Sequence, residues 1–124
     1  MSELLKNKVA IVTGGTRGIG YAIVRKYVQE GATVVLCGSR EETAQKALAK
    51  LKEEFPQAQV DAIWPALSDR KSVAEAFNSV KEKYGRIDIL ANNASISHNN
   101  TFFDYKDEDF DKILDINIRA VYAC

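Results

Sequence analysis

The 124-residue sequence has little of what marks several specialised classes of protein. Its 17 basic and 17 acidic side chains cancel, so the net charge does not favour nucleic acid as a partner. The two cysteines, Cys37 and Cys124, show no metal-ligand spacing, and we expect Cys37 to be a buried thiol in a reducing compartment. No apolar run has the length of a membrane span, and no signal-peptide pattern precedes the first predicted strand. These absences predict a cytoplasmic protein without a metal site, a membrane segment or a nucleic-acid partner.

The composition itself is that of ordinary globular material, with 46% hydrophobic and 27% charged residues. A chain of this length has room for one hydrophobic core. Internal repeats, low-complexity tracts and linkers are absent from the sequence. We therefore expect residues 1–124 to belong to a single domain.

Short β-branched runs alternate along the chain with stretches of helical periodicity. The predicted strands are Val9–Thr13, Thr33–Cys37, Val60–Trp64 and Ile87–Ala91. Three helices are predicted, and they end at Gly31, before Pro56 and at Gly85. The third of them begins after Ser68 or Asp69 as its N-cap, and a further helix is predicted to start near Glu108. Such alternation implies right-handed crossovers and a parallel sheet covered on both faces. We predict an α/β fold of the doubly wound (Rossmann) type, with about four strands in this chain.

The first strand runs into a cluster of glycines, TGGTRGIG, at the head of the first predicted helix. Gly14 is suited to a sharp turn out of the strand, Gly18 to close approach of a ligand, and Gly20 to packing of the helix against the sheet. Backbone N–H groups at such a helix start bind phosphate, so we expect the pyrophosphate of a dinucleotide there. Standing alone, the cluster is equally compatible with a solvent-exposed loop. Its apolar helix face is predicted to comprise Gly20, Val24 and Val28 together with Ile19, Ile23 and Tyr27.

Two further motifs follow at later positions, Asn92-Asn93-Ala94 and Asp115-Ile116-Asn117. With TGGTRGIG they give the chain a sequence that resembles the short-chain dehydrogenase/reductase family over nearly its whole length, with a weaker resemblance to ketoacyl reductases and hydroxysteroid dehydrogenases. The resemblance implies hydride transfer between a nicotinamide cofactor and a small-molecule carbonyl or alcohol. It also implies cofactor binding by Gly14, Thr16, Arg17, Gly18, Ile19, Gly20, Ser39, Arg40, Leu67, Asn93 and Ala94.

The end of the second strand indicates which cofactor fits. An NAD site of this architecture has a carboxylate there for the adenosine ribose, whereas an NADP site needs a cation for the 2′-phosphate. The sequence offers Ser39 and Arg40, with Arg17 in the glycine turn, so NADP is favoured and NAD stays possible. The alternative is that Arg40 is merely a solvated residue beside a helix start.

Two of the matching segments depart from the family pattern. Ala66 stands where an aspartate commonly contacts the adenine region, which leaves Leu67 and the backbone to hold the base. Ser95 stands where a glycine usually follows Asn93-Ala94. Without the resemblance, Asn92 and Asn93 read as ordinary turn formers at a strand end.

Asn117 lies in an otherwise apolar helical stripe that includes Phe110, Ile113, Leu114 and Val121. A buried amide needs a hydrogen-bond partner, which is either a neighbouring carbonyl or, as the resemblance implies, a water of a catalytic proton relay. His98, the one histidine, lies in a polar loop and is expected to be solvated.

The family's catalytic serine, tyrosine and lysine are not found, because no Y-x-x-x-K occurs in these 124 residues. We therefore expect the chain to correspond to the amino-terminal, cofactor-binding half of a longer domain and to be inactive alone. A non-catalytic NAD(P)-binding module and a purely structural fragment are the alternatives. Phe102 and Phe103 favour an apolar substrate, and a homo-oligomer is expected.

Overall fold

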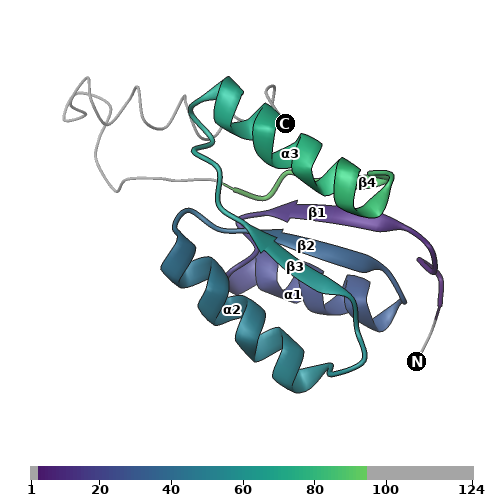
Figure 1. Ribbon diagram of the computed structural model, residues 1–124. Helices are drawn as coiled ribbons and strands as arrows, with labels where there is room; N and C mark the ends of the chain where they lie inside the picture. The colour runs from purple at the N-terminus through teal and green to yellow at the C-terminus, as the bar shows by residue number, and fades with distance from the viewer. Residues whose placement is uncertain (1–2, 95–124) are drawn as a thin grey trace, which may run out of the picture.

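A computed structural model of the chain describes residues 3–94. Within this range strands and helices alternate as predicted (Figure 1). The strands are β1 (Val9–Thr13), β2 (Thr33–Cys37), β3 (Val60–Ile63) and β4 (Ile89–Ala91), and the helices are α1 (Gly18–Gln29), α2 (Glu41–Glu54) and α3 (Arg70–Tyr84). The helix predicted from near Glu108 lies outside the described residues.

The four strands form one parallel sheet in the order β3-β2-β1-β4. From β1 the chain winds outward to β2 and β3, then crosses back over the sheet to β4 on the other side of β1. The winding direction therefore reverses between β1 and β4, and the carboxyl ends of all four strands meet at one edge. This is the predicted doubly wound architecture, whose reversal point is where such folds bind ligands.

Helices cover both faces of the sheet (Figure 1), so the two-sided burial expected of a parallel sheet is present. On one face, α1 and α2 bury Val24, Val28 and Leu51 against β-strand side chains such as Leu36. On the other face, α3 packs Val80 and Phe77 against a cluster that includes Ile11. Every residue of β1 is buried, because it is one of the two central strands, with a neighbouring strand on each side and helices on both faces.

The predicted apolar face of α1 is wrong at its first residue, Ile19. Gly20, Val24 and Val28 are buried as expected, but the side chain of Ile19 is 75% exposed. The physical reason is that the first turn of α1 extends past the end of β1, where no sheet surface lies beneath it. Ile19 lines a cleft instead.

The predicted helix ends are largely confirmed. Asp69 caps α3 by accepting a hydrogen bond from the Lys71 N–H at 3.0 Å, and Gly85 ends the helix in a left-handed conformation with φ 82°. Strand β4 begins two residues later than predicted. Its approach is held by Asp88, whose carboxylate accepts the Val9 N–H at 2.9 Å and binds Arg86.

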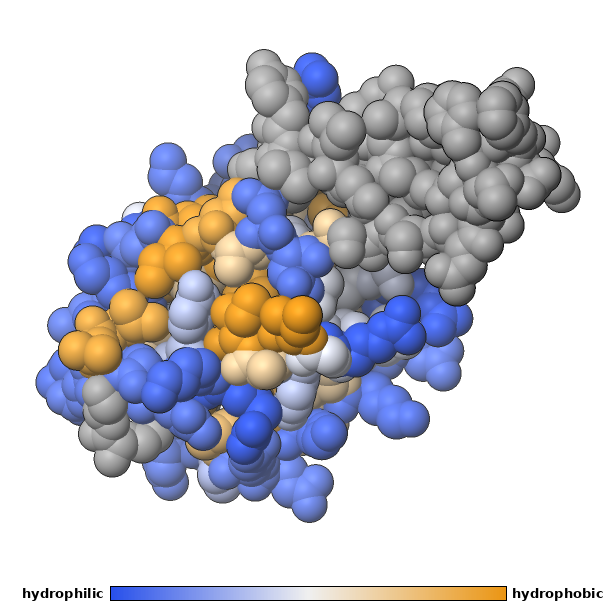
Figure 2. All heavy atoms as spheres, turned by 180° about the vertical axis from the view of Figure 1, so that it is seen from behind, coloured by the Kyte–Doolittle hydropathy of each residue, from blue (hydrophilic) through white to orange (hydrophobic). Residues whose placement is uncertain are grey.

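The surface between these elements is mixed in polarity. In Figure 2 apolar side chains reach the rear face in separate patches between hydrophilic ones. Leu4, Ile19 and Trp64 are the large apolar side chains that are exposed within residues 3–94. None of the three helices described here combines the length and the hydropathy needed to cross a bilayer.

Candidate functional site

A cleft of about 660 Å³ lies at the edge of the sheet where the strands end. Four segments line it, one from the end of each strand, which is the arrangement that the topology predicts. Its lining residues are Gly14, Thr16, Arg17, Gly18, Ile19, Cys37, Gly38, Ser39, Pro65, Ala66, Leu67, Ser68, Asn93 and Ala94. Of the eleven residues predicted to bind a cofactor, the cleft therefore brings together all but Gly20 and Arg40.

The start of α1 opens onto this cleft without a side-chain cap. Arg17 occupies the N-cap position in extended conformation and makes no capping hydrogen bond, and no acidic residue lies in the first turn. The first N–H groups of a helix point out of its end and carry its positive dipole. An anion seated above Gly18 would meet these groups, and a Cβ built on Gly18 finds no atom within 4 Å. The turn is therefore open to a phosphate.

Gly20 does not line the cleft but packs directly against residues that do. A Cβ at this position would lie 1.9 Å from the carbonyl oxygen of Gly14 and 2.5 Å from Nδ2 of Asn93. The sequence predicts that Gly20 allows the helix to approach the sheet. The structure specifies the approach, because the helix start touches the glycine turn and the β4 loop rather than a strand side chain.

A buried hydroxyl joins the glycine turn to the loop after β4. Oγ1 of Thr13 accepts hydrogen bonds from the N–H groups of Asn93 and Ala94, both at 3.0 Å, and its own hydroxyl lies 3.4 Å from the Ala91 carbonyl oxygen. The Asn93 side-chain amide donates to the Gly14 carbonyl at 3.2 Å. Together these bonds fix both sides of the cleft floor. Asn93 therefore acts on the cleft partly through the backbone that it holds.

Thr13 is a residue that sequence reasoning missed. Its side chain is only 2% exposed. The available signal was a hydroxyl at the end of a strand whose other residues are all apolar, because a buried hydroxyl must find a hydrogen-bond partner. In the sequence it reads simply as another β-branched strand residue.

The segment after β2 forms the next part of the cleft. Gly15 N–H donates to the Cys37 carbonyl at 3.1 Å and Gly38 N–H donates to the Ile63 carbonyl at 2.9 Å, so the ends of β1, β2 and β3 are tied in sequence. Cys37 is buried, as expected. Ser39 lines the cleft and is exposed.

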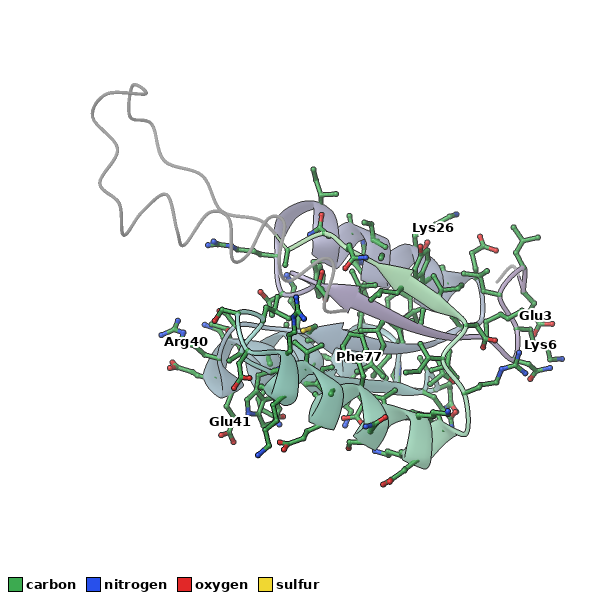
Figure 3. The ribbon with its side chains drawn as sticks, turned by 90° about the horizontal axis from the view of Figure 1, so that it is seen from above. Glu3, Lys6, Lys26, Arg40, Glu41 and Phe77 are labelled. Carbon is green, nitrogen blue, oxygen red and sulfur yellow. The ribbon has the colours of Figure 1, made fainter. Side chains whose placement is uncertain are left out.

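The two arginines predicted to bind a phosphate occupy different positions. Arg17 lines the cleft and is the one charged residue among the lining residues within 3–94. Arg40 is the N-cap residue of α2, is exposed and is not a lining residue. Figure 3 shows Arg40 projecting beside Glu41 at the end of the molecule opposite Glu3 and Lys6. The cleft therefore holds a positive charge through Arg17, with Arg40 one residue beyond Ser39.

The segment after β3 forms the remaining wall, and three of its four residues were not predicted to bind. Pro65, Ala66 and Ser68 line the cleft beside the predicted Leu67. The Ala66 N–H donates to Oγ of Ser72 at 2.9 Å, and the Ala66 carbonyl accepts the Asp69 N–H at 2.9 Å. These bonds connect the wall to the first turn of α3.

A carboxylate with three hydrogen-bond donors around it, that of Asp61, lies outside the cleft. Burial of Asp61 on β3 raises its pKa, but hydrogen bonds from Lys83 at 2.6 Å and from the Ala62 N–H, with the charge of Lys83, outweigh this. The pKa of Asp61 is therefore lowered overall. The Tyr84 hydroxyl also donates to it at 3.1 Å, and burial together with this carboxylate raises the pKa of Tyr84. This cluster fastens α3 to the edge strand and has no catalytic geometry toward the cleft.

Other predicted features lie beyond the part of the chain that the structure describes. They include Asn117, the loop with His98, and Phe102 and Phe103. Within residues 3–94 no group of three or more histidine, cysteine or carboxylate side chains is placed to hold a metal ion.

Comparison with known proteins gives three findings. A family model described as short chain dehydrogenase matches residues 8–124. The chain is 52% identical over 124 residues to a 3alpha-hydroxysteroid dehydrogenase of Mediterraneibacter gnavus, covering 100% of this chain and 50% of that protein. It is 36% identical over 118 residues to a 3-oxoacyl acyl-carrier-protein reductase of Thermotoga maritima, covering 95% and 47% respectively.

A solved structure gives the same picture in three dimensions. The crystal structure of a short chain dehydrogenase from Burkholderia cenocepacia in complex with NADP superposes with a TM-score of 0.86 at 37% identity, covering 96% of this chain and 48% of that one. The chain thus spans about half the length of the curated relatives it matches.

Proposed function

Since the chain belongs to the short-chain dehydrogenase family, we propose that its cleft binds NADP(H) for hydride transfer to or from a small-molecule carbonyl or alcohol. One observation carries the proposal. The uncapped start of α1 faces a cleft in which Arg17 is the one charged residue among the described lining residues. A cleft with a helix dipole, a cation and no carboxylate suits an anionic ligand. The NADP-bound relative supports the choice of cofactor.

The positions of the lining residues suggest how the cofactor would lie. The pyrophosphate would rest on the backbone of Gly14, Thr16, Gly18 and Ile19 at the helix start. The adenosine ribose would lie at the end of β2 beside Ser39, as in dinucleotide sites of this architecture. The bound cofactor would supply or accept the hydride, and the described residues would bind and orient it.

The two arginines differ in how they could contact the 2′-phosphate of NADP. Arg17 lies on the cleft and can make a charge-assisted bond to this phosphate, and we propose that it contributes more than Arg40, which lies beyond Ser39. No carboxylate lines the described cleft at the end of β2, where an NAD site would have one. We propose further that Asn93 and Ala94 form the floor on the β4 side, that Leu67 contacts the base, and that Asn117 acts in proton transfer.

The substrate proposal rests on the relatives. The Mediterraneibacter gnavus protein is named a 3alpha-hydroxysteroid dehydrogenase and matches the entire chain. We therefore propose a secondary alcohol or ketone on an apolar molecule, of the hydroxysteroid type. A homo-oligomer and a cytoplasmic location remain predictions.

Separate titrations with NADPH and NADH, followed by the fluorescence of the reduced nicotinamide, test the cofactor proposal. We expect tighter binding of NADPH. Arg17→Ala should weaken NADPH about ten-fold, the value of one charge-assisted hydrogen bond, and leave NADH nearly unchanged. Arg40→Ala should have a smaller effect.

Lys46→Ala provides the matched control, because it removes one positive charge from the exposed surface of α2, away from the cleft. If Lys46→Ala weakened NADPH as much as Arg17→Ala, the effect would reflect net charge and not the site. Equal affinity of the wild-type chain for NADPH and NADH would overturn the NADP proposal.

An activity assay tests the prediction that these 124 residues bind the cofactor without using it. We expect no consumption of NADPH with a 3-oxosteroid or a small ketone, because no Y-x-x-x-K supplies the proton. Turnover of either ketone by the chain would contradict this prediction.

A further inference from the structure

The wall that follows β3 is thin. Pro65 lines the cleft on one side and, on the other, an outer groove of about 350 Å³ that also touches Trp64 and Ser72. The sheet ladder does not support this wall, because β3 ends at Ile63. Pro65 therefore lies between the two hollows, with the cleft on one side and the outer groove on the other.

Hydrogen bonds to α3 replace that support. Within residues 3–94 the wall is tied to the helix by the Ala66 N–H, which donates to Ser72 Oγ at 2.9 Å, and by the Ala66 carbonyl, which accepts the Asp69 N–H at 2.9 Å. The second bond is a local turn between residues three apart. The first bond spans six residues and enters the first helical turn, whose own position is fixed by the Asp69 cap. Ser72 is thus the side chain that anchors the wall to a rigid element.

The position of the wall indicates which part of a ligand it would meet. In the order β3-β2-β1-β4, the glycine turn lies at β1, and the β3 wall lies beyond β2 on the side away from β4. The adenosine ribose of a dinucleotide lies at the end of β2. A base attached to that ribose would therefore meet Ala66 and Leu67, which line the cleft there.

We propose that Ser72 is a positioning residue for the cofactor, whose hydroxyl holds Ala66 and the neighbouring wall in place for the adenine base. The proposal rests on the cofactor function proposed above. Ser72 lines the outer groove and not the cleft, so it acts through the backbone of Ala66. Both main-chain groups of Ala66 are used in holding the wall, which leaves its methyl group to contact the base.

The test compares Ser72→Ala with two other variants. Ser79→Ala is the matched control, because Ser79 is an exposed serine of the same helix. Ser72→Thr is the rescue variant, since it keeps the hydroxyl and the groove has room for a methyl group. Ser72→Ala should weaken adenosine 2′,5′-bisphosphate and NADPH about five-fold, the value of about one net hydrogen bond (about 1 kcal/mol). Binding of reduced nicotinamide mononucleotide, which lacks the adenine, should not change.

Amide hydrogen exchange in the ligand-free chain separates this inference from the cofactor proposal. Ser72→Ala should raise the exchange rate of the Ala66 amide, whereas Ser79→Ala and Ser72→Thr should not. If the wild-type chain bound neither NADPH nor the bisphosphate, the cofactor function would fail while the exchange result still tested the anchor. Unchanged exchange at Ala66, or an equal loss for all three ligands, would overturn the role of Ser72.

Discussion

Replacement of Thr13 by valine removes one hydroxyl from the cleft floor while keeping the shape of the side chain. In the wild-type chain this oxygen accepts the N–H groups of Asn93 and Ala94, each at 3.0 Å, in a position that is 2% exposed. Valine would leave two N–H groups without an acceptor. Each lost bond of this kind costs about 1 kcal/mol, so we expect a loss of about 2 kcal/mol in the free energy of unfolding. The free energy of unfolding of a whole domain is only about 5–15 kcal/mol.

Urea and thermal unfolding of the wild-type chain, Thr13→Val and Thr13→Ser measure this loss. For a domain of about 100 residues, 2 kcal/mol lowers the melting temperature by about 10 °C. Thr13→Ser keeps the oxygen and loses one methyl group, which costs about 1 kcal/mol. The expected stability order is therefore wild type, then serine, then valine. A valine variant as stable as the serine variant would refute the assignment of Thr13 as the acceptor that joins the two loops.

Three further predictions concern other parts of the fold. Gly20→Ala should lower the free energy of unfolding by about 3 kcal/mol and abolish cofactor binding, since its Cβ would lie 1.9 Å from the Gly14 carbonyl oxygen. Chemical unfolding and NADPH titration measure the two effects, and wild-type values in both would contradict the prediction. Asp69→Ala should cost about 1 kcal/mol in urea unfolding through loss of the α3 cap, and a neutral result would exclude a capping role. The lowered pKa of Asp61 stabilises the fold above the unfolded-state pKa of about 3.9, and this contribution is lost as the pH falls through the folded-state pKa. Asp61→Asn should therefore flatten the dependence of the free energy of unfolding on pH below about pH 4. An unchanged slope would count against the Lys83 contact.

The fold was predictable from local patterns alone. The β-branched run Val9–Thr13 and the helix that ends at Gly85 carry their signals in consecutive residues, and the structure confirms both. The right-handed crossovers implied a parallel sheet, and the structure gives its strand order, β3-β2-β1-β4. The end of β3 was placed one residue too late. The start of β4 was placed two residues too early, because the carboxylate of Asp88 takes the Val9 N–H that a longer β4 would use.

The candidate site was predictable where its residues form a contiguous motif. TGGTRGIG and Asn93-Ala94 predict a phosphate-binding turn and a neighbouring loop, and the structure brings these two segments together at the cleft. Thr13 and Ser72 were not predictable, because their roles depend on partners that are distant in sequence or outside any motif. Ile19 was placed both in the apolar face of α1 and among the cofactor-binding residues. The structure has it exposed in the cleft lining, and periodicity alone does not show where the sheet beneath a helix ends.

The sequence by itself determined the alternating order of strands and helices, the glycine turn and the membership in a family, since each depends on residue type and short spacing. The tertiary structure decided which groups meet across that order. It placed Arg17 on the cleft and Arg40 outside its lining, set Gly20 against the Gly14 carbonyl, and gave the buried hydroxyl of Thr13 two donors from the end of β4. These are contacts between segments up to 81 residues apart, and only the packing of the parallel sheet brings such segments within hydrogen-bonding distance.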